Sequence, residues 1–146
     1  MKTSRQALKL FTNGYSCSQA ILIAFAKDVD LEKDTAFSIG AGLGGGVGRT
    51  QNICGAINAG AIILGLRFGN YSSDDSEAKN QLASKVATFV NECKLELGAT
   101  QCLELTKVDL NNETLKNHAS KSGHLARVCN NAVEVVARIL EKYIHQ

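Results

Sequence analysis

A run of small and apolar residues near the middle of the chain limits what the protein can fold into. Residues 53–66 carry no charge, and glycine and alanine are interleaved there with isoleucine and leucine. A helix that is apolar on all sides belongs in the centre of a domain or in a membrane, and this run is shorter than the roughly 20 residues that a span needs. We therefore predict a buried central helix over residues 52–67, which follows a glycine-rich loop that begins at Gly40.

The composition of the remaining chain favours helices. The 146 residues include no proline and no tryptophan, and only 5% are aromatic. Proline interrupts helices, so its absence favours long uninterrupted ones. No segment alternates apolar and polar residues in the manner of a strand. We predict that residues 1–146 form a single all-α domain, a compact bundle of about five or six helices around the Gly/Ala-rich central helix.

Helical spacing of apolar residues and end signals place the other segments. Asp74 and Glu77 resemble a capping box at the start of a long helix, and Gly98 is a natural stop for it. The secondary-structure signal is weakest in the segment before the last helix, where a helical turn is expected at residues 113–119. The other predicted helices cover residues 3–12, 16–27, 33–41, 74–97, 100–107 and 125–143.

Charge and targeting signals narrow the class of protein. The formal net charge is +2 and the basic residues are scattered, which suggests no nucleic acid or anionic membrane as a partner. The first residues, MKTSRQALKLF, contain no long apolar stretch of the kind found in secretion signals. We therefore expect a cytoplasmic protein without a membrane span.

The cysteines are the main candidates for chemistry. There are five, an odd number, and in a reducing compartment such cysteines are buried, catalytic or metal-binding more often than paired. The first turn of a helix lowers a thiol pKa through its unpaired N–H groups and its dipole. Cys93 lies on the core stripe of the long helix and is expected to act as a small hydrophobe. Three cysteines are predicted in first turns, each behind a capping residue: Cys17 behind Ser16, Cys54 behind Asn52, and Cys102 behind Thr100.

The arrangement of motifs resembles a known family. The segment from Phe11 to Ala20, the glycine loop, the sequence Cys54-Gly55-Ala56, and two later cysteines resemble the CGCAxxGCC-motif family, whose members are described as redox-active and are often associated with transporter genes. The resemblance covers nearly the whole chain. It implies that the family cysteines are Cys17, Cys54, Cys102 and Cys129. One position departs from the motif, because its last glycine falls on Ala59 and a glycine follows at Gly60.

These observations lead to three hypotheses. In the first, Cys17, Cys54, Cys102 and Cys129 converge from separate helices as a thiol redox site with possible thiol/disulfide oxidoreductase activity, and Cys54 is the most activated thiolate. In the second, the same residues ligate an iron–sulfur cluster or a soft metal ion. In the third, the protein is a helical interaction module that serves a transporter. A redox partner protein, a transporter-associated protein or a second copy of the chain are the partners that these hypotheses allow.

Three other signals are weaker. Residues 40–45 satisfy the GxGxxG pattern, but no strand is predicted before them, so nucleotide binding is disfavoured. Arg49 and the start of the central helix favour an anion instead. His118 and His124 could combine with a cysteine at a metal site, although their polar, lysine-rich surroundings favour solvated histidines.

Overall fold

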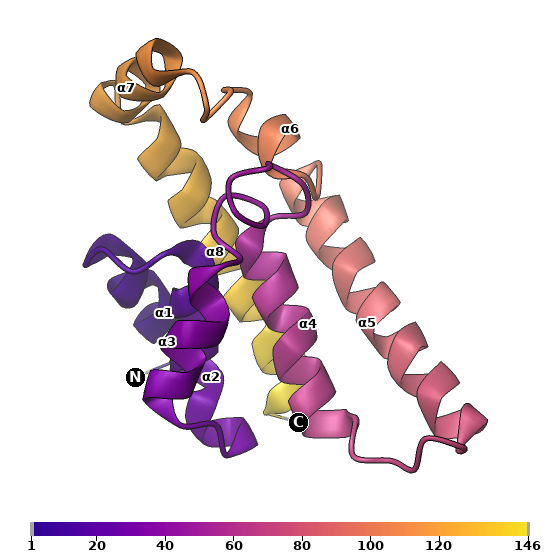
Figure 1. Ribbon diagram of the computed structural model, residues 1–146. Coiled ribbons are helices and arrows are strands. Elements are labelled where there is room, and N and C mark those ends of the chain that lie inside the picture. The colour runs from indigo at the N-terminus through magenta and orange to yellow at the C-terminus, as the bar shows by residue number, and fades with distance from the viewer. Residues whose placement is uncertain (1, 146) are drawn as a thin grey trace.

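The computed structural model describes residues 2–145, and within that range the chain is helical, with no strand (Figure 1). The prediction of an all-α fold is confirmed, but five or six helices is too low a number. The short segments near residues 102 and 113 form helices of their own, the second capped by Asn112, whose side chain accepts a hydrogen bond from the Leu115 N–H. The helices are α1 (Thr3–Thr12), α2 (Cys17–Phe25), the 3₁₀ helix η1 (Ala26–Val29), α3 (Lys33–Ala41), α4 (Gly55–Phe68), α5 (Ser76–Leu97), α6 (Cys102–Thr106), α7 (Glu113–Lys121) and α8 (His124–Ile144).

The Gly/Ala-rich helix α4 lies at the centre of the bundle, as predicted. It packs against α2, α8 and α5, and Figure 1 shows it between α2 and α3 on one side and α5 on the other. Ala56, Ala59, Ile63 and Leu64 are fully buried in it. Its small side chains let these neighbours approach closely. Among residues 2–145, no helix is long and apolar enough to cross a membrane.

The central helix begins later than predicted. Residues 52–54 stay extended because they pair with the segment before α6: the Cys54 N–H donates to the Thr100 carbonyl at 2.8 Å, and the Cys102 N–H donates to the Asn52 carbonyl at 2.7 Å. Cys54 is therefore the N-cap of α4, and the predicted second helical position is wrong. Cys102 is likewise the first residue of α6, behind Gln101 instead of Thr100.

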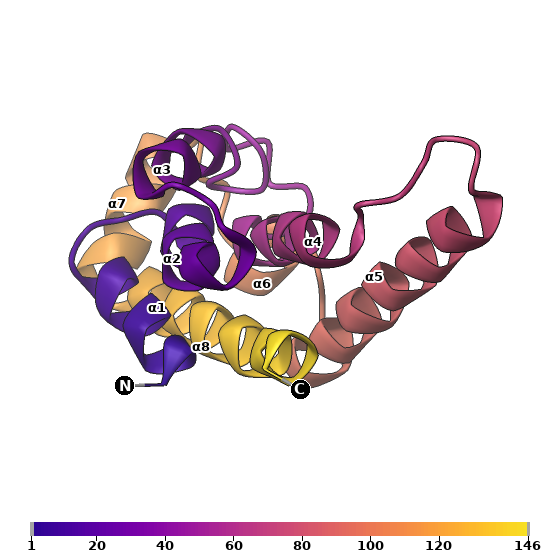
Figure 2. The ribbon, with the colours of Figure 1, turned by 90° about the horizontal axis from the view of Figure 1, so that it is seen from below.

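The long helix α5 also has a different cap from the predicted one. The Asp75 carboxylate accepts the Ala78 N–H at 3.0 Å, whereas the Asp74 carboxylate accepts the Ser72 hydroxyl. No capping box forms with Glu77. Seen from below, the first half of α5 diverges from α4 (Figure 2). The buried residues of α5, Phe89 and Cys93, lie in its second half.

The last helix closes the bundle against the first. α8 packs along α1, and the Ser4 N–H donates to the Glu141 carboxylate between them. α8 also packs against α4 and α5. The helix follows the apolar spacing expected from the sequence, with Val136, Ile139 and Leu140 fully buried. This arrangement brings the first turns of α2 and α4 to the same end of the bundle as the first half of α8 (Figure 1).

Candidate thiol site

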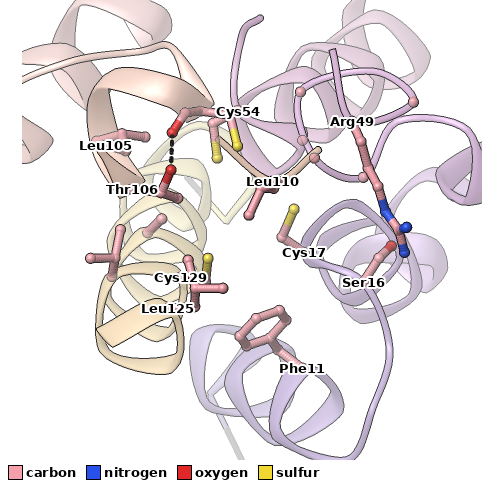
Figure 3. Close-up of a pocket in the computed structure, with 18 of the residues that line it drawn as sticks. Phe11, Ser16, Cys17, Arg49, Cys54, Leu105, Thr106, Leu110, Leu125 and Cys129 are labelled. Atoms are coloured by element: carbon pink, nitrogen blue, oxygen red, sulfur yellow. Dashed lines mark hydrogen bonds between the residues drawn. The ribbon is translucent and has the colours of Figure 1, made fainter. Parts of the chain in front are cut away.

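A cavity of about 470 Å³ lies at that end of the bundle, and four cysteines line it: Cys17, Cys54, Cys102 and Cys129. We call it the cysteine cavity. These are the four residues predicted as a site, and the chain brings them together from α2, the cap of α4, α6 and α8. Figure 3 shows the sulfur atoms of Cys17, Cys54 and Cys129 around a shared space, with Phe11 of α1 on its far side.

The start of α2 fixes the position of Cys17. The Ser16 hydroxyl oxygen accepts the Gln19 N–H at 3.2 Å, and the Gln19 side-chain oxygen accepts the Ser16 N–H at 3.0 Å. This capping box makes Cys17 the first residue of the helix, as predicted. Next to it, the buried Ser18 hydroxyl donates to the Gly40 carbonyl at 2.7 Å and ties α2 to α3. The Cys17 side chain therefore leaves a rigid helix end.

Cys17 and Cys54 interact directly and have opposite pKa shifts. A hydrogen bond from the Cys54 thiol lowers the pKa of Cys17 below its usual value, although burial opposes this shift. The backbone N–H groups of Gly45 and Ser18 also lower it. The pKa of Cys54 lies well above its usual value, because its proton is held by Cys17 and because it is buried. Cys17 is thus the more acidic thiol of the pair, and Cys54 the less acidic one.

This order reverses the prediction that Cys54 is the most activated thiol. The N–H groups of Ala56 and Ile57 do favour a Cys54 thiolate, as expected for a helix start, but they rank behind Cys17 and burial as causes of its pKa shift. Cys54 is only 7% exposed, whereas Cys17 is partly exposed. Removal from water and a neighbouring thiolate therefore outweigh the helix end at this position.

The Cys54→Ala substitution should raise the pKa of Cys17. It removes the largest cause of the lowered pKa and leaves burial, which raises it. The rate of alkylation of Cys17 by iodoacetamide, followed by mass spectrometry as a function of pH, should have a higher midpoint in the variant and be severalfold slower at neutral pH. Cys129→Ala is the matched control, because Cys129 does not contribute to the lowered pKa of Cys17, so the midpoint should stay in place or fall. An unchanged midpoint in Cys54→Ala would contradict the assignment.

The other cysteines remain protonated at neutral pH. Burial is the largest cause of the raised pKa of Cys102 and of Cys129, the latter to about 11. The side-chain amide of Gln51, whose nitrogen lies 3.9 Å from the Cys102 sulfur, opposes the shift at Cys102. Cys93 is fully buried in the core and does not line the cavity, and burial raises its pKa to about 12. It occupies the core position that the sequence predicts.

The residues that could bind a metal ion do not form a suitable group. Within residues 2–145, no three His, Cys, Asp or Glu side chains are placed to hold an ion together. The four cavity cysteines thus share one space without the close convergence that a tetrahedral thiolate site needs. His118 and His124 lie elsewhere, beside a smaller pocket with Lys107, and His124 contacts the Thr106 carbonyl at 2.6 Å.

The glycine-rich segment forms an unusual loop over the cavity. Residues 45–49 all have positive φ, including Val47 at 70° and Arg49 at 62°. No strand precedes it among the described residues, so it is not a dinucleotide-binding turn. Val47 and Arg49 thus have left-handed backbone conformations, which residues other than glycine adopt only when the surrounding structure imposes them.

Gln51 holds this loop in place, and the sequence pattern did not mark it as important. It is 6% exposed and has a φ of 60°. Its side-chain nitrogen donates to the Val108 carbonyl at 2.7 Å, and its side-chain oxygen accepts the Leu110 N–H at 2.9 Å. The loop is thereby fixed to the segment after α6, which supplies Leu110 to the cavity. The role of Gln51 is visible only from these two hydrogen bonds, because they join positions that are far apart in the chain.

The comparison with family models gives one match. Residues 15–143 match the model described as "Putative redox-active protein (C_GCAxxG_C_C)". The chain belongs to the C_GCAxxG_C_C family. Comparisons with curated proteins and with solved structures give no match.

Membership of the C_GCAxxG_C_C family confirms the resemblance drawn from the motifs. The position that departs from the motif, Ala59, is fully buried, and the glycine that follows it lies under the ring of Phe89. The close packing that small residues allow is therefore present at Gly60, one residue after the motif position.

Proposed function

We propose that this protein is a thiol–disulfide redox protein in which Cys17 and Cys54 form a reversible disulfide. The observation that carries the proposal is the placement of Cys17 and Cys54 on the wall of one cavity, with the Cys17 sulfur against Gly55, the residue after Cys54. The lowered pKa belongs to Cys17, the more exposed partner. Its membership of a family described as redox-active supports the same chemistry.

The reaction is an exchange with an organic disulfide, RSSR. The Cys17 thiolate attacks one sulfur of RSSR, a mixed disulfide forms, and one RS⁻ leaves. Cys17 then no longer carries a negative charge, so the main cause of the raised Cys54 pKa disappears. Cys54 gives its proton to the departing thiolate, and its sulfur, favoured by the Ala56 and Ile57 N–H groups, attacks Cys17 and releases the second RS⁻. The protein loses two electrons and the Cys54 proton, so RSSR becomes one RSH and one RS⁻, and this RS⁻ takes a proton from water.

Cys102 and Cys129 act as secondary partners in this proposal. Their raised pKa values keep them protonated at neutral pH, so neither starts the exchange. Both line the cavity, where each can exchange with the Cys17–Cys54 disulfide. The metal-ligand alternative is not proposed, because the described residues lack a suitable donor group.

Thiol counting tests the proposal. Anaerobically reduced protein treated with hydroxyethyl disulfide should lose two of its five free thiols, and peptide mapping should find Cys17 joined to Cys54. Cys17→Ser should abolish the loss, and Cys54→Ser should stop at a mixed disulfide on Cys17. Cys93→Ala is the control that should still lose two thiols.

Other outcomes would separate the hypotheses. Loss of two thiols in Cys17→Ser would contradict the proposed nucleophile. Bound iron with thiolate absorption bands in an anaerobic preparation would support the metal-ligand alternative. If all thiols of the folded protein stay unreactive, the transporter-associated interaction module is the hypothesis that remains. That module and a homodimer both stay predictions from the sequence.

A further inference from the structure

The wall of the cysteine cavity is mainly apolar. A volume of about 470 Å³ is typical of sites that enclose a small molecule. Apart from the cysteines, the lining consists mainly of glycine backbone and large apolar side chains, which come from α1, α6, the segment after α6, and α8: Phe11, Leu105, Leu110, Leu125 and Val128. A molecule that enters whole would meet an apolar surface next to the two interacting thiols.

Arg49 is the cationic side chain of this cavity. It lines the cavity together with Ser16, and Figure 3 shows its guanidinium beside Ser16, away from the apolar wall. Among the ion pairs of residues 2–145, none involves Arg49, in contrast to Arg138, which pairs with Glu96 and Glu134. A guanidinium without a carboxylate partner at the edge of a cavity can bind an anionic group of a ligand.

The loop holds Arg49 in place at a conformational cost. Its backbone has a φ of 62°, and its N–H donates to the Gly44 carbonyl at 3.1 Å. Its own carbonyl accepts the side-chain amide of Asn111 at 3.1 Å. Strained residues that the surroundings fix in this way concentrate at ligand-binding positions. The side chain of Arg49 thus starts from a rigid point on the cavity wall.

We propose that the cysteine cavity takes a low-molecular-weight disulfide that bears a carboxylate, with the carboxylate on Arg49 and the sulfur atoms at Cys17. The inference rests on the proposed function and names its substrate class. The apolar wall receives the rest of the molecule. A small disulfide fits better than a protein disulfide, because Cys17, the thiol that attacks, lines a cavity whose volume of about 470 Å³ suits a small molecule.

The covalent steps are those of the exchange described above. One S–S bond of the substrate breaks, one Cys17–Cys54 bond forms, and two molecules of carboxylate-bearing thiol leave. The protein supplies two electrons and the Cys54 proton, and water protonates the second leaving thiolate. Arg49 takes no part in these bonds, and it acts as a binding residue that raises the local concentration of the anionic substrate at Cys17.

The test compares three disulfides of different charge: dithiodiglycolate with two carboxylates, neutral hydroxyethyl disulfide, and cationic cystamine. Each rate of Cys17–Cys54 disulfide formation is divided by the rate of the same compound with free mercaptoethanol, which removes intrinsic reactivity. We expect dithiodiglycolate to be about tenfold faster than hydroxyethyl disulfide, as for one charge-assisted contact. Arg49→Gln should remove this preference, so that dithiodiglycolate and hydroxyethyl disulfide react at equal normalised rates.

Arg67→Gln is the matched control. Arg67 is an exposed arginine in the last turn of α4 and does not line the cavity, so its loss lowers the net charge equally and should keep the preference. Equal normalised rates for the anionic and neutral disulfides, or an Arg49→Gln effect of the same size on all three, would overturn the inference while the proposed function stands. If none of the three compounds joins Cys17 to Cys54, the proposed function itself fails.

Discussion

The Gly55→Ala substitution is expected to disable the thiol pair and destabilise the fold together. A Cβ atom at this position would lie 2.8 Å from the Cys17 sulfur and 2.8 Å from the Leu43 carbonyl oxygen. Real side chains do not approach so closely, so the sulfur and the loop backbone must both move. We expect the free energy of unfolding to fall by about 2 kcal/mol, the usual cost of overpacking. Alkylation of Cys17 at neutral pH should slow severalfold, because the sulfur leaves the Cys54 thiol and the Gly45 N–H.

The matched control lies in the same helix. A Cβ atom at Gly65 would meet no atom within 4 Å apart from its chain neighbours and the backbone of its own helix, so Gly65→Ala should leave Cys17 reactivity unchanged. Alanine is the better helix former by about 1 kcal/mol, and the free energy of unfolding should stay the same or rise. Urea unfolding and pH-dependent alkylation measure both properties. Wild-type alkylation of Cys17 in Gly55→Ala would contradict the close contact between Gly55 and the sulfur.

The Gly60→Ala substitution should be the more destabilising of the two. The added Cβ atom would lie 2.3 Å from one carbon of the Phe89 ring and 2.7 Å from another. That ring is fully buried, and Tyr143 packs against it edge to face with 5.9 Å between the ring centroids. The ring therefore has little room to retreat. We expect a loss of about 3 kcal/mol in the free energy of unfolding, measured by urea titration.

A double mutant isolates the contact. Phe89→Leu alone removes the ring and leaves space under α5, which costs stability by creating a cavity. In the Gly60→Ala/Phe89→Leu protein the alanine methyl group occupies part of that space, so the loss should be smaller than the sum of the two single losses. Additive losses would mean that the methyl group is accommodated elsewhere. Gly65→Ala again serves as the control for helix propensity.

The features that depend on neighbours along the chain could be predicted from the sequence. The spacing of Val128, Val136 and Leu140 identified α8, and the uncharged run of small residues identified α4 as the central helix. Cys93 was placed in the core by the same spacing. For the site, the resemblance to a family selected the four cysteines, and a bundle of this size brings them to one cavity.

The features that depend on distant parts of the chain could not be predicted. The start of α4 is set by the bond from the Cys54 N–H to Thr100, so the expected cap at Asn52 does not form. The order of the thiol pKa values follows from the contact between Cys17 and Cys54, which no local motif encodes. The fixed position of Arg49 depends on Gln51 and on a segment almost sixty residues further along. Sequence signals for helix ends report only on neighbouring residues, and they miss contacts with distant parts of the chain.

The pairing of α8 with α1 has a consequence for how the protein is made. Phe11 of α1 and Leu125 of α8 both line the cavity, so the cavity is complete only when α8 has been synthesised and has docked on α1. Contacts between such distant segments form late in folding. Until then Cys17, Cys54 and Cys102 lie on an open nascent chain, where each can react with any oxidant. The reactivity that the cavity restricts in the native protein is therefore least controlled during translation, when protection of these thiols depends on the reducing capacity of their surroundings.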